Sequence, residues 1–113
     1  MPAGYQDLFL EQATTFTTSL TLQDQNGLPY NLNGFTVRSQ ARKSYISANA
    51  TITFTTSVLD ANNGVIELSV DAPTTANVPY SKLVYDVLLT QTSTGTVSRV
   101  LEGQIFVSPT ATR

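Results

Sequence analysis

The chain has 113 residues, the size of one compact domain, and it contains no cysteine, histidine or tryptophan. Without thiol or imidazole groups it cannot form a disulfide, a usual zinc, haem or iron–sulfur site, or a Ser-His-Asp or Cys-His catalytic set. A net charge of −2 gives no basic footprint for nucleic acid. We therefore expect a single domain over residues 1–113 that is not an enzyme and has no catalytic residue, cofactor or metal.

The N-terminal residues lack the basic and apolar regions of a signal peptide, and no apolar run reaches the length of about 20 residues that spans a bilayer. These features predict a protein made in a cytoplasm, without a membrane partner.

Apolar residues alternate with threonine and serine along most of the chain, which is typical of antiparallel strands with one face in water. Asn-Gly pairs between the runs favour tight reversals. A short helical turn is expected near residues 72–77, where Asp71 could cap it and Pro73 fits its first turn. The pattern predicts an all-β, two-sheet antiparallel sandwich of about seven strands, at 6–10, 15–23, 35–43, 51–59, 64–70, 82–91 and 96–107.

The inward positions of these runs give the expected core. Its members are the apolar residues of period two, supplemented by the apolar side of the two strands near the C-terminus. They are Phe16, Leu20, Leu22, Val37, Ile52, Phe54, Ile66, Leu68, Val70, Tyr85, Val87, Leu101 and Ile105.

Charged side chains concentrate on three strands that we expect to be neighbours. Asp86 is the only charge in the run from Leu83 to Leu89, so it needs a cationic partner. We expect Asp86 to accept hydrogen bonds from an arginine on an adjacent strand, Arg99 first. A carboxylate pair for acid–base chemistry is the alternative interpretation, but a cross-strand ion-pair ladder is favoured. Its candidates are Asp86, Arg99, Glu102, Arg38 and Arg42.

Tyrosines near strand ends are candidates for contacts with other proteins, because tyrosine combines apolar area with a polar tip. The candidates are Tyr30, Tyr45 and Tyr80.

Five phrases of the chain carry a family resemblance: LFLEQATTF at 8–16, DQNGLPYNLNGFTVR at 24–38, ARKS at 41–44, YDV at 85–87 and RVLEGQIFVSP at 99–109. Together they resemble a small immunoglobulin-like module of tailed-bacteriophage virion proteins. The module is similar to the N-terminal domain of the phage upper baseplate protein family and to stand-alone virion structural proteins of cyanophages. Members usually have glycine where Ala13 stands here.

The resemblance implies an immunoglobulin-like sandwich with a structural role in a virion, made in the cytoplasm of a host bacterium. Such a protein would dock to other virion proteins in the tail, baseplate or fibre-attachment region, as a homo-oligomer or in several copies. Capsid decoration, or cement, is one alternative. A module that binds carbohydrate or a host surface is the second.

Overall fold

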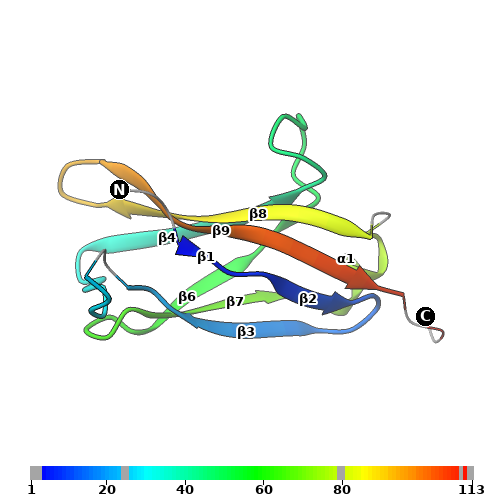
Figure 1. Ribbon diagram of the computed structural model, residues 1–113, viewed down its shortest axis with the longest axis horizontal. Helices are drawn as coiled ribbons and strands as arrows, with labels where there is room; N and C mark the ends of the chain where they lie inside the picture. Colours follow the sequence, from blue (N-terminus) through cyan, green and yellow to red (C-terminus); the bar gives the residue numbers. More distant parts are fainter. Residues whose placement is uncertain (1–3, 24–25, 79–80, 110, 112–113) are drawn as a thin grey trace.

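The computed structural model describes residues 4–23, 26–78, 81–109 and 111 of the chain. Two β-sheets pack face to face, and one short helix lies at an end of the sandwich (Figure 1). The elements are β1 (Gly4–Tyr5), β2 (Leu8–Glu11), β3 (Phe16–Thr21), β4 (Phe35–Arg42), β5 (Ile52–Thr53), β6 (Thr55–Asp60), β7 (Val65–Val70), α1 (Ala72–Ala76), β8 (Lys82–Gln91) and β9 (Val97–Ser108).

The larger sheet, sheet A, has the order β1-β9-β8-β4-β5, with β2 also paired to β9. The smaller sheet, sheet B, has the order β3-β7-β6. A three-stranded sheet thus packs on a six-stranded one. The predicted all-β sandwich is therefore confirmed, and the three charged strands β4, β8 and β9 are indeed neighbours.

Pairing among the described strands β3 to β9 is antiparallel, as expected, and the N-terminal strands differ. Both β1 and β2 run parallel to β9, with Gly4 opposite Leu101 and Leu8 opposite Ile105. The chain then crosses to sheet B through a turn in which Ala13 has a φ of 60°. In this turn an alanine takes the left-handed conformation that glycine enters more readily.

The predicted strand 51–59 is two strands that belong to different sheets. β5 pairs with β4 in sheet A, whereas β6 pairs with β7 in sheet B. Phe54 lies between them and is buried, and its backbone N–H donates to the carbonyl oxygen of Ser39 at 3.0 Å. The period of two continues through the change of sheet, so the sequence pattern gives no sign of the break.

The core contains nearly all of the expected residues. Phe16 and Leu20 are the exceptions, because β3 is an edge strand and leaves them only half-buried. The structure adds residues that the alternation in the central runs did not identify, among them the inward side chains of β2 and the loop residues that close the two ends of the sandwich. These are Leu8, Leu10, Leu32, Ala41, Val78, Leu83, Leu89 and Val107.

The predicted helical turn is confirmed as α1. The carboxylate of Asp71 accepts a hydrogen bond from the backbone N–H of Thr74 at 3.1 Å, which caps the helix. The fully buried hydroxyl of Thr75 donates to the carbonyl oxygen of Thr14 at 2.7 Å. This bond ties the helix to the β2–β3 turn.

Candidate functional site

Among the described residues, the outer face of sheet A carries the most varied side chains. This is the face that points away from sheet B. Alternate residues of β4, β8 and β9 face inward and are buried, so the residues between them face outward. The outward set combines charged, amide and apolar side chains. It includes Arg38, Gln40, Arg42, Lys82, Val84, Asp86, Leu88, Arg99, Glu102, Gln104 and Phe106.

One ion pair of the predicted ladder is present. Nη2 of Arg99 lies 3.0 Å from Oε2 of Glu102, three residues along the same strand. Their side chains are 48% and 30% exposed, so water screens this pair and its contribution to stability is small. The pair neutralises Glu102 within β9 rather than linking two strands.

The predicted bond between Asp86 and an arginine does not form. Asp86 lies opposite Gln40 on one side and Glu102 on the other, so neither direct neighbour is a cation. Arg42 lies opposite Val84, and its guanidinium donates to the carbonyl oxygen of Ser47 and to Oε1 of Gln40, both at 3.0 Å. The competing acceptors near Arg42 thus hold it away from the carboxylate.

A β-bulge in β9 decides where Arg99 points. Val87 pairs with Leu101, but the next residue, Leu88, pairs with Arg99, so Val100 is the additional residue. Without this bulge Arg99 would fall on the inward side of the alternation. The bulge therefore keeps the guanidinium of Arg99 out of the core. It places Arg99 opposite Leu88, which lies two residues from Asp86 on the same face of β8.

Burial raises the pKa of Asp86, and the neighbouring Glu102 raises it further. Arg99 and Arg42 act in the opposite direction, but their effect is smaller than that of burial. The carboxylate sits in the middle of a sheet face with Gln40 and Glu102 beside it. The ionised form of Asp86 is consequently disfavoured relative to a solvated aspartate.

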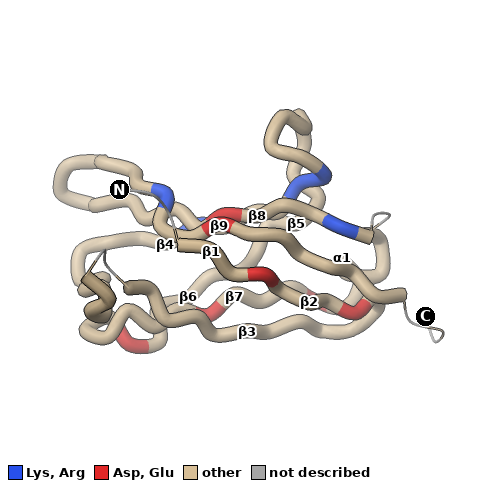
Figure 2. Tube along the Cα trace, in the orientation of Figure 1, with Lys and Arg blue, Asp and Glu red and all other residues tan. Residues whose placement is uncertain are grey.

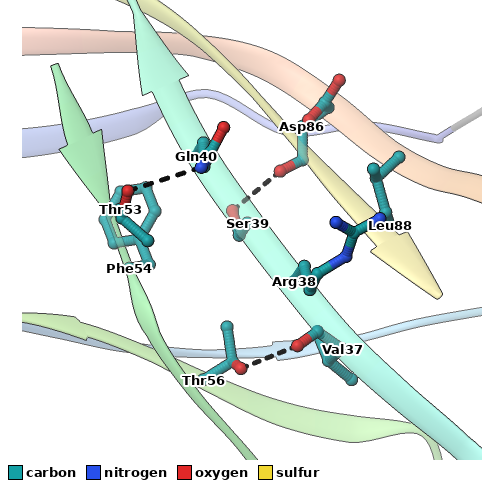
Figure 3. Close-up of a pocket in the computed structure, with 9 residues that line it drawn as sticks. All are labelled: Val37, Arg38, Ser39, Gln40, Thr53, Phe54, Thr56, Asp86 and Leu88. Atoms are coloured by element: carbon teal, nitrogen blue, oxygen red, sulfur yellow. Dashed lines mark hydrogen bonds between the residues drawn. The ribbon is translucent and has the colours of Figure 1, made fainter. Parts of the chain in front are cut away.

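A hollow of about 170 Å³ lies where the chain passes from β5 to β6 beside β4. Figure 3 shows that its polar groups bond to each other: the hydroxyl of Ser39 donates to the Asp86 carbonyl oxygen at 2.7 Å, and that of Thr56 donates to the Val37 carbonyl oxygen at 2.8 Å. Arg38 extends beside Leu88 (Figure 3). Since the two hydroxyls bond to backbone oxygens and not to a base, they are not activated as nucleophiles.

The three candidate tyrosines have different environments. Tyr30 is half-buried and packs edge-on against Phe35, with ring centroids 6.0 Å apart, so it belongs to the rim of the core. Tyr45 is 55% exposed in the loop between β4 and β5. Tyr80 lies outside the described residues. Of the described pair, Tyr45 alone has the exposure that a contact residue needs.

Other exposed apolar side chains were not identified from the sequence. Ile46, next to Tyr45, is 95% exposed, and Phe9 is 74% exposed while it stacks on Phe106 with centroids 5.5 Å apart. Tyr5, which lies opposite Glu102, is 61% exposed. Each of these side chains is an apolar residue at an outward position of a strand or in a loop. The outward positions can be recognised only once the strand register is known.

The described residues hold no group of three or more histidine, cysteine, aspartate or glutamate side chains that could bind a metal ion. Within the same part of the chain, no helix is long and apolar enough to cross a membrane. Comparison with protein-family models gives no match, and comparison with curated proteins gives none either.

Proposed function

We propose that this protein is a non-enzymatic structural protein of a bacteriophage virion, which docks to other virion proteins in the tail, baseplate or fibre-attachment region. The observation that carries the proposal is the group of exposed apolar side chains on and around one sheet face: Tyr5, Phe9, Tyr45 and Ile46. Aromatic and aliphatic anchors beside a polar rim are characteristic of protein–protein contacts. The family resemblance supplies the virion setting.

The chemistry of the face also supports a docking role. Asp86 and Glu102 are the adjacent carboxylates of the described sheet face, and Glu102 is already paired with Arg99. They lie on neighbouring strands of a sheet rather than across a cleft. A surface of this kind favours binding to another protein surface over acid–base chemistry on a small substrate.

Electron microscopy of intact particles tests the proposal. Particles labelled with a gold-conjugated antibody against this chain should carry the label at the tail or baseplate. Label over the capsid would replace this placement with the decoration role. A chain that is missing from purified particles, both by labelling and by mass spectrometry, would overturn the proposal.

A further inference from the structure

The basic residues of the described chain lie on one side of the sandwich, whereas carboxylates lie on both. Sheet A and the segments adjoining it carry five of the six basic residues, Arg38, Arg42, Lys43, Lys82 and Arg99, against four carboxylates, those of Asp7, Glu11, Asp86 and Glu102. The side of sheet B carries Asp60, Glu67 and Asp71 and, among its described residues, no lysine or arginine. Figure 2 shows this division, with the blue segments along β4, β8, β9 and the adjoining loop.

The two sides also differ in relief. The segment between β4 and β5 stands out on the side of sheet A (Figure 1), with Tyr45 and the 95% exposed Ile46 in it. The outer face of sheet B has a hollow of about 450 Å³. Threonines of β3, β6 and α1 line this hollow, and so do Glu67 and Asp71. One side therefore offers a projecting apolar loop with basic residues at its base, and the opposite side offers an acidic depression.

Glu67 further supports the complementarity between the basic loop and the acidic depression. It lies half-buried in the middle of sheet B, between Ser19 and Ser57 on the neighbouring strands, and its carboxylate forms no hydrogen bond or ion pair with the described residues. A half-buried carboxylate without a cation gains from an arginine or lysine supplied by a second surface. The cations of the described residues lie on the opposite side, where Glu67 cannot reach them.

We propose that copies of this chain stack front to back, with the β4–β5 loop and the basic side of sheet A of one copy seated on the acidic outer face of sheet B of the next. The occupant of the sheet B hollow is then Ile46 of a second copy, its flanking cations facing Glu67. The molecule measures 43 × 28 × 24 Å, so its broad face can supply the roughly 800 Å² per partner that a specific interface buries.

Two different surfaces meet in this contact, so it is heterologous. A heterologous contact leaves a free surface on each end of a pair, and association continues into a ring or an open stack. The proposal is independent of the virion role, because self-association is measured on the purified chain alone.

Sedimentation velocity over a concentration series that reaches about 1 mM, the Kd of a weak contact, tests the stack. The weight-average mass should rise beyond that of a dimer at low salt. It should fall back toward the monomer in about 1 M NaCl, where the Debye length shrinks to about 3 Å. A monomer at every concentration in low salt would overturn the proposal.

Two single variants separate this contact from other kinds of association. Ile46→Asp damages the loop, and Glu67→Arg damages the hollow, so each alone should associate at least about tenfold more weakly than the parent. Mixed in equal amounts, they should form a one-to-one pair that grows no further, since one intact loop meets one intact hollow. Leu28→Asp, an equivalent change at a 60% exposed residue outside both surfaces, should associate like the parent.

Circular dichroism of each variant establishes that it is folded before the mixing experiment. If the folded variants do not form pairs on mixing, or if Leu28→Asp weakens association as much as Ile46→Asp, the front-to-back contact is wrong. Association of the parent without rescue on mixing would indicate a symmetric dimer instead, and would equally overturn the stack.

Discussion

Gly103 allows the N-terminal segment to lie against the edge of sheet A. The backbone carbonyl of Gln6, between β1 and β2, accepts a hydrogen bond from the hydroxyl of Tyr85, a side chain that is only 1% exposed. A Cβ atom on Gly103 would lie 2.0 Å from that carbonyl oxygen and 3.1 Å from Cε1 of Tyr85. In Gly103→Ala the backbone at Gln6 must therefore move away from β9, because the new methyl group cannot occupy the space of the Gln6 carbonyl oxygen.

The expected loss of unfolding free energy can be worked from these contacts. Overpacking a filled site costs about 1–3 kcal/mol. A Tyr85 hydroxyl left buried without an acceptor adds about 1–3 kcal/mol. We expect Gly103→Ala to lose about 3–5 kcal/mol in all, measured by urea unfolding. Gly4→Ala is the matched control, since its Cβ would meet Leu101 at an ordinary 3.5 Å.

A double-mutant cycle separates the two contributions. Tyr85→Phe alone should cost about 1–2 kcal/mol, because the Gln6 carbonyl loses its donor. In the Gly103→Ala background the same change should cost little, since the bond is already broken. Strict additivity of the two changes, or a Gly103→Ala variant as stable as Gly4→Ala, would refute the reasoning.

Three further predictions concern the turns and Asp86. Ala13→Gly should raise stability slightly, by at most about 1 kcal/mol in thermal unfolding, because relief of the left-handed strain exceeds the added chain entropy; a clear loss would contradict it. Gly64→Ala should cost about 1–3 kcal/mol more than Gly27→Ala in urea unfolding. Both glycines have positive φ, but a Cβ on Gly64 would lie 2.6 Å from the Leu22 carbonyl oxygen, whereas Gly27 has open space; equal losses would argue against this crowding. Burial raises the pKa of Asp86 in the folded state, so the stability that its neutral form contributes at low pH is lost as the pH rises through that pKa. Asp86→Asn should therefore gain stability relative to the parent as the pH rises above about 4, the ordinary pKa of an aspartate, and a pH-independent difference would oppose this.

Patterns along the chain are enough to predict the class of the fold and most of the core. Alternation of apolar residues with threonine and serine fixes which side of a strand meets the other sheet, because successive side chains point to opposite faces. Asp71 and Pro73 likewise determined α1 locally, since a cap needs only neighbouring residues. Strand alternation and helix capping each depend on residues close together in the chain, so the sequence alone can predict them.

Features that depend on pairing between distant residues could not be predicted from the sequence. Phe54 marks a change of sheet within one alternating run, which no local signal could reveal. The sequence places the charged residues on three neighbouring strands, as the structure has them. The bulge at Val100, however, sets the register of β9 against β8. Arg99 therefore pairs with Glu102 instead of Asp86. Ile46 is exposed, and the Glu67 carboxylate has no cation among the described residues. That the two residues lie on opposite sides of the sandwich follows only from the packing of the two sheets. Register and sheet assignment are set by the packing of the whole domain, so they are settled only when the chain has folded.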